Sequence, residues 1–143
     1  ATLVHVLFGL LLIYEINCLC YERLDDSEKF CSKAIGIEEN EIMTLEGGDE
    51  DSQEVFEEFI NCLWTVYDFV DENGEISYHK IRESNDLVWE PAKKCFELPT
   101  ARKRKNNAMG KAIDFCEEHP PQPEEPVAVR KCLIDIANFA LLF

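Results

Sequence analysis

The sequence predicts an all-α fold, a compact disulfide-linked bundle of about six helices. Apolar residues recur at three- and four-residue spacing, as they do on the buried face of a helix. No segment shows the apolar–polar alternation of a half-buried strand. Seven cysteines in a chain of 143 residues, behind an apolar N-terminus typical of exported proteins, indicate that disulfides hold the bundle together.

Composition limits the class of protein. The length fits one domain, and 46% hydrophobic residues exclude disorder. The chain has 14 Lys and Arg against 29 Asp and Glu, a formal net charge of -15. Such a charge repels phosphate backbones and anionic lipid headgroups, so we expect no nucleic-acid partner and no peripheral binding to membranes. It also favours a monomer or a weak dimer.

Residues 1–18 are predicted to be a secretory signal peptide and residues 19–143 a single domain. The apolar run from Leu3 to Ile13 is short for a membrane span and Glu15 follows it, which disfavours the alternative of a membrane anchor. Cleavage after Cys18 leaves an even set of six cysteines, whereas cleavage after Cys20 leaves five. We therefore expect a secreted, extracellular protein with six paired cysteines, namely Cys20, Cys31, Cys62, Cys95, Cys116 and Cys132.

Two short helices are expected first. Acidic residues at 25 and 26 can cap a helix over 25–34, which Gly36 ends. The second lies within residues 37–46 and ends at Gly47-Gly48.

The third helix has the clearest pattern. Asp51 or Ser52 is its expected cap, and Glu54 completes a capping box with Asp51. The helix is expected to run to about Phe69 and to stop at Asn73-Gly74, with Trp64 off its apolar stripe. That stripe consists of Val55, Phe56, Phe59, Ile60, Leu63, Val66, Tyr67 and Val70.

Three further helical segments follow. One begins at Glu75 or Ser77, and Pro91 restricts the helical part of the next stretch. Thr100 is the expected cap of a helix whose first turn, ARKRK, is basic and therefore unfavourable beside the helix dipole. The inner face of this helix is expected to contain Ala108, Ala112, Ile113 and Cys116.

The last helix is expected to begin at Pro126, after a proline-rich connector. It is apolar almost all round toward its end. The residues expected to be buried are Leu133, Ile136, Ala140 and Leu141.

The stretch VDENGEISYHK, residues 70–80, resembles an EF-hand calcium loop but lacks some of the required oxygen ligands. With Gly74 at the sixth position of an EF-hand, Asp71 and Asn73 are placed well. Phe69 and Lys80 then occupy the first and twelfth positions, where oxygen ligands are required. We expect no calcium site here, and Gly74 to serve as a helix stop.

The sequence also lacks the residue patterns that are typical of zinc sites and of secreted hydrolases. No C-x2-C pair exists for zinc, and His79 and His119 are not at ligand spacing from a cysteine pair. No His-Asp pair beside paired cysteines, as in secretory phospholipases A2, and no Gly-x-Ser-x-Gly motif occurs. We expect no cofactor, no metal and no enzymatic activity.

Cysteine spacing within the helical frame resembles that of the insect odorant-binding proteins, the pheromone/general odorant-binding family. The similar part runs from about Glu22 to Glu118, with 30 residues between Cys31 and Cys62 and a DENGEI-type turn after the third helix. The resemblance implies helices that converge around an internal apolar pocket.

The family pairs its first cysteine with the third, the second with the fifth and the fourth with the sixth. Here the second would fall at Glu58 and the fifth at Asn107, so one bridge is missing, a minus-cysteine pattern. The resemblance implies the bridges Cys31–Cys62 and Cys95–Cys116, and leaves Cys20 to pair with Cys132.

The run YDFVDENGEISYHKI is also similar to the D7 salivary proteins of blood-feeding flies, which scavenge biogenic amines or eicosanoids. The positions corresponding to an amine pocket in those proteins hold Ala34 and Phe59, neither of which supplies the acid or the hydrogen-bonding group that such a pocket needs. An amine ligand is therefore disfavoured.

The resemblance implies a secreted carrier or scavenger of small hydrophobic ligands, such as an odorant, a fatty acid or an eicosanoid-like lipid. An alternative is an interaction protein, acting in saliva, that blocks a host protease or clotting factor through its acidic surface. His79 and His119 are candidates for pH-dependent release. The candidate ligand-binding residues are Phe56, Phe59, Ile60, Leu63, Tyr67 and Trp89.

Overall fold

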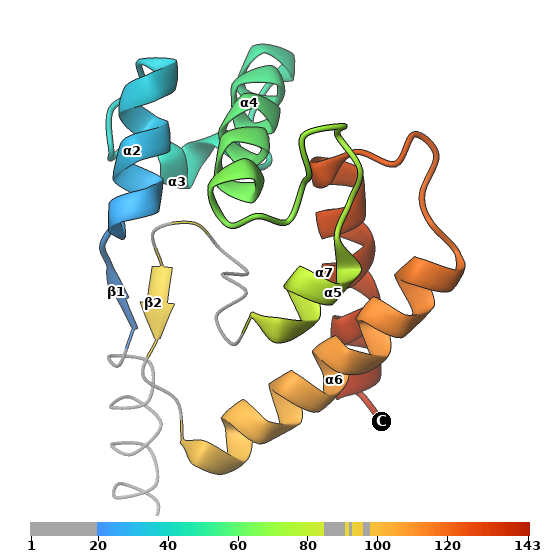
Figure 1. The fold of residues 1–143 in the computed structure, drawn as a ribbon. Helices are drawn as coiled ribbons and strands as arrows, with labels where there is room; N and C mark the ends of the chain where they lie inside the picture. Colours follow the sequence, from blue (N-terminus) through green and yellow to red (C-terminus); the bar gives the residue numbers. More distant parts are fainter. Residues whose placement is uncertain (1–19, 85–90, 92, 96–97) are drawn as a thin grey trace, which may run out of the picture.

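The computed structural model describes residues 20–84, 91, 93–95 and 98–143. The predicted signal peptide and Trp89 lie outside these residues. The described part contains six helices and two short strands (Figure 1). The strands are far apart in the sequence and pair to form one antiparallel sheet. No described helix is both long and apolar enough to cross a membrane.

The expectation of an all-α fold of about six helices is confirmed. The helices are α2 (Asp26–Ile35), α3 (Ile42–Leu45), α4 (Glu50–Val66), α5 (Tyr78–Glu83), α6 (Pro99–Glu118) and α7 (Pro126–Leu141). The strands β1 (Cys20–Glu22) and β2 (Lys93–Cys95) were not expected. Three residues are too few to display an alternating pattern, so the sequence gives no sign of this sheet.

Helix α2 begins where its capping residues predict. The Asp25 carboxylate accepts a hydrogen bond from the backbone N–H of Glu28 at 2.8 Å, and the Glu28 carboxylate accepts one from the N–H of Asp25 at 2.7 Å. This reciprocal pair is a capping box. Gly36 ends the helix with a φ of 75°, a left-handed conformation that glycine adopts without steric cost.

Helix α4 differs from its prediction at both ends. Its cap is Asp49, not Asp51 or Ser52, because the Asp49 carboxylate accepts hydrogen bonds from the Ser52 hydroxyl at 2.6 Å and the Ser52 N–H at 3.0 Å. These bonds lower the pKa of Asp49. The helix ends at Val66 rather than near Phe69, and Asp68 follows with a φ of 59°.

The last two helices of the chain, α6 and α7, both begin at prolines. Pro99 is the first residue of α6 and Leu98 its cap, so Thr100 lies inside the helix and does not cap it. Helix α7 begins at Pro126, as predicted. On α7 Leu133 is buried, whereas Ile136, Ala140 and Leu141 are half-buried.

Helix–helix contacts divide the molecule into two connected groups (Figure 1). Helix α4 packs against α2, α3 and α7, while α6 packs against α7 and α5. Helix α7 therefore joins the two groups. One apolar cluster runs through both, and its largest fully buried hydrophobic side chains are Phe59, Ile42, Ile60, Ile81, Leu133 and Val129.

A candidate ligand-binding site along helix α4

The inner face of α4 brings together most of the sequence-predicted binding residues. Phe56, Phe59, Ile60 and Leu63 are all at least 95% buried and belong to the same apolar cluster. Their spacing of three and four residues places them on one side of the helix. This face is apolar and continuous over two turns, as required for contact with an apolar ligand or with the protein core.

Trp64 also lies on this face, contrary to the expectation that it is off the stripe. It is 4% exposed, and its ring contacts that of Phe69 edge-on with centroids 5.6 Å apart. The signal was present in the sequence, since Trp64 follows Phe56 and Ile60 at intervals of four residues.

Tyr67 is placed at the margin of the cluster. Its hydroxyl donates a hydrogen bond to the Asp25 carboxylate at 3.2 Å, and its ring lies 5.5 Å from that of Phe69. The phenol therefore connects the end of α4 to the start of α2. Because its polar end is directed toward Asp25, Tyr67 contributes its ring rather than its hydroxyl to the apolar face.

Arg130 is a buried charged residue beside the apolar cluster, and it was not among the residues predicted from the sequence. It is 6% exposed, and its guanidinium lies 5.2 Å from the centre of the Phe56 ring. Two of its nitrogens donate to the two carboxylate oxygens of Glu46, at 2.7 and 3.3 Å. The spacing of Arg130 from the buried Leu133 and Ala137 could have indicated this position.

The disulfide Cys31–Cys62 joins α2 to α4, with the two Cα atoms 5.7 Å apart. This is the pair that the family resemblance implied. Because Cys62 follows Phe59 by three residues, the bond attaches α2 directly beside the apolar face. The chain-entropy model assigns such a bond about 3–4 kcal/mol of stabilisation.

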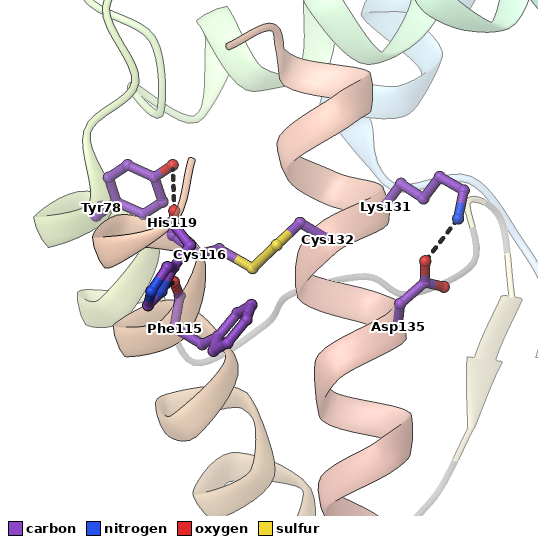
Figure 2. The surroundings of a disulfide bond; sticks show 7 residues. All are labelled: Tyr78, Phe115, Cys116, His119, Lys131, Cys132 and Asp135. Carbon is purple, nitrogen blue, oxygen red and sulfur yellow. Dashed lines mark hydrogen bonds and ion pairs between the residues drawn. A yellow bond between two sulfur atoms is a disulfide. The ribbon is translucent and has the colours of Figure 1, made fainter. Parts of the chain in front are cut away.

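The second described disulfide corrects the other implied pairings. Cys116 of α6 is bonded to Cys132 of α7, with Cα atoms 6.2 Å apart (Figure 2). The expected bridges Cys95–Cys116 and Cys20–Cys132 are therefore wrong. α6 and α7 pack against each other, joined by a short connector, so Cys116 and Cys132 are neighbours in space.

The structure does not support the interpretation that one family disulfide has been lost between positions 58 and 107. Glu58 and Asn107 are both exposed, the first on α4 and the second on α6. The cysteine pattern of this chain thus differs from the family arrangement at more than one bond.

Residues 70–76 form a turn closed by a bridge between Val70 and Ile76. The Asp71 carboxylate accepts hydrogen bonds from the N–H groups of Asn73 and Glu75 at 2.8 and 2.9 Å. Gly74 has a φ of 81° and belongs to this turn, so it is not the stop of α4. Among the described residues, no group of three or more His, Cys, Asp or Glu could hold a metal ion.

The two histidines proposed for pH-dependent release lie away from the apolar face. His79 is exposed and its Nε2 lies 3.2 Å from the Glu83 carboxylate. His119 is exposed too and stacks on Phe115, with ring centroids 4.8 Å apart (Figure 2). Neither ring contacts the α4 residues through a described interaction.

These features define a disulfide-linked helical protein with a continuous apolar face on its central helix. The sequence matches the family model of the PBP/GOBP family over residues 20–135, and the chain belongs to that family. Members of this family are binding proteins that carry small hydrophobic ligands. Comparisons with curated proteins and with solved structures found no match.

Proposed function

We propose that this protein is a secreted carrier or scavenger of small hydrophobic ligands that binds without catalysis, with residues 1–18 as its signal peptide and 19–143 as its single domain. Membership of the PBP/GOBP family over residues 20–135 is the observation that supports this function. Two disulfides in the described chain support export, because such bonds persist in oxidising compartments.

The proposed binding site lies along the buried apolar face of α4. Phe56, Phe59, Ile60 and Leu63 form its centre, Tyr67 its edge, and Trp89 is retained from the sequence alone. Burying about 500 Å² of apolar ligand contributes about 12 kcal/mol. An association cost of about 4 kcal/mol leaves about 8 kcal/mol, which corresponds to a micromolar Kd.

Arg130 favours an anionic ligand within this class. It is the one cation among the buried described residues, and it lies against Phe56. A ligand carboxylate that exchanges with that of Glu46 would keep the bidentate geometry while its apolar chain lies along α4. A fatty acid or an eicosanoid-like lipid therefore fits better than a neutral odorant, and an amine is repelled.

A competition experiment tests this function. A fluorescent apolar probe is bound to the oxidised protein and displaced by a fatty acid, by its methyl ester and by a biogenic amine. We expect saturable probe binding, displacement by the acid at least ten-fold more effective than by the ester, and none by the amine. In Arg130→Met the acid and the ester should become equal. Absence of saturable binding contradicts the carrier function.

A matched pair of variants tests whether the ligand binds at the apolar face of α4. Phe56→Leu changes the buried face of α4, whereas Phe139→Leu makes the same change on a ring that is 62% exposed. We expect weaker displacement only in Phe56→Leu, with both variants folded by circular dichroism. If no ligand binds and the wild type instead associates with a basic protease in a salt-sensitive manner, the alternative function as a protease or clotting-factor blocker is supported.

A further inference from the structure

Basic residues are concentrated in one short part of this acidic chain. Residues 93–111 contain 7 of the 14 Lys and Arg residues and only one of the 29 Asp and Glu residues. They include strand β2 and the part of α6 that runs as far as Lys111. The net charge of -15 therefore conceals a local positive region, and the remainder of the chain is more acidic than its average suggests.

Three of these residues form a basic face on α6, which we define as Lys103, Arg104 and Lys111. All three are exposed. At 100° per residue they lie on the side of the helix opposite the buried Ala112 and Ile113. Lys103 and Lys111 lie about 12 Å apart along the helix axis.

Among the residues that the structure describes, no acid neutralises the basic face. Neither Lys103 nor Lys111 makes an ion pair with another described residue. Arg104 only reaches the carbonyl oxygen of Leu141, at 3.5 Å. The nearest acid along the helix, Asp114, accepts from Arg82 at 2.7 Å. These cations are thus available to a partner.

We infer that the basic face binds a sulfated polysaccharide. Disulfides place the chain in an oxidising compartment, where polyanions of this kind are presented outside cells. A flexible polyanion needs a row of exposed cations and no apolar contact, which is what α6 offers. An interfacial membrane helix needs a free apolar side, and the apolar side of α6 is buried against its neighbours.

The overall negative charge does not prevent this contact. At physiological ionic strength charges are screened beyond about 8 Å, so the cations nearest the polysaccharide determine the interaction. The basic face is separate from the apolar face of α4, because the two faces lie on different helices. Polysaccharide binding should therefore persist in a protein whose apolar-ligand binding has been weakened, as in Phe56→Leu.

Heparin-affinity chromatography of the full-length oxidised protein tests the inference. We compare the wild type with Lys103→Gln/Arg104→Gln/Lys111→Gln. The wild type should be retained at about 0.15 M NaCl, and the variant should elute earlier with affinity reduced at least ten-fold. Each phosphate or sulfate contact contributes nearly one unit to the slope of log K against log salt, so the slope should fall by about two to three.

The matched control is Lys29→Gln/Lys33→Gln/Lys80→Gln, which removes the same charge from exposed positions elsewhere. It should elute with the wild type. The inference is overturned if the wild type is not retained, if both triple variants weaken equally, or if desulfated heparin binds as well. Tighter binding to phosphatidylserine vesicles or duplex DNA, or self-association that heparin does not alter, also overturns it.

Discussion

Cys20 and Cys95 are directly opposed in the antiparallel pairing of β1 with β2. Opposed residues in such a pair have Cα atoms about 4.5–5.5 Å apart, which is within the range that a disulfide spans. With Cys116 and Cys132 bonded to each other, the two cysteines left from the expected six are therefore neighbours.

We predict that Cys20 and Cys95 form a third disulfide. Peptide mapping of the oxidised protein without reduction should recover the two residues in one linked fragment, and Cys20→Ser/Cys95→Ser should lose about 4 kcal/mol of stability because of the long loop. Alkylation of Cys95 in the unreduced native protein would refute the pairing.

Replacement of two glycines by alanine is expected to change the stability of the protein in opposite directions. Gly74→Ala should destabilise by about 1 kcal/mol, because its φ of 81° is unfavourable for a residue with a Cβ. Gly110→Ala should stabilise by about 0.5–1 kcal/mol, because Gly110 is inside α6 and an added Cβ meets nothing within 4 Å. Urea denaturation measures both. Equal effects would contradict the assigned backbone conformations.

Mutation of Glu46 should destabilise the protein more than mutation of its ion-pair partner Arg130. Glu46→Ala removes the bidentate partner of a buried guanidinium and should destabilise by about 1–3 kcal/mol. Arg130→Met replaces the cation by an apolar side chain and leaves Glu46, whose side chain is 47% exposed, to water, so it should change stability by less. Chemical denaturation ranks the two variants, and the reverse order would show that Arg130 is not effectively buried.

Tyr78 should make the protein sensitive to alkali. Burial, followed by the negative charge of Glu124, raises the pKa of Tyr78 above its usual value of about 10. In the unfolded chain the phenol ionises first, so its contribution to stability is complete below pH 10 and is lost as the pH rises further. The loss is up to about 1.4 kcal/mol per pH unit.

The comparison for Tyr78 is with Tyr78→Phe, measured by urea denaturation between pH 8 and pH 11. The variant lacks the hydrogen bond from the phenol to the Cys116 carbonyl, 3.2 Å long, and should be less stable at pH 8. The difference from the wild type should shrink above pH 10. Tyr21→Phe, which alters a ring that is 58% exposed, is the control, and a constant difference for Tyr78→Phe would contradict the prediction.

Local signals in the sequence were sufficient for most of the helices. Asp25, Ser77 and Pro126 each mark a helix start that the structure contains, because capping and the fixed φ of proline act within a few residues. At α4 several acids could cap, and the choice of Asp49 depends on the bonds it makes to Ser52.

Features that depend on distant parts of the chain were not predictable in this way. The pairing of Cys116 with Cys132 follows from the contact between α6 and α7, whereas the family resemblance implied other partners. Burial of Arg130 requires Glu46, which is 84 residues away. The apolar face of α4 was predictable because periodicity within one helix defines it.

The bond between Cys116 and Cys132 encloses the exposed, proline-rich connector between α6 and α7. A peptidase that cuts this connector therefore produces two pieces that stay covalently attached. Such a nicked molecule keeps both helices packed and changes its apparent size only after reduction. Limited digestion within this connector is thus tolerated without loss of either piece.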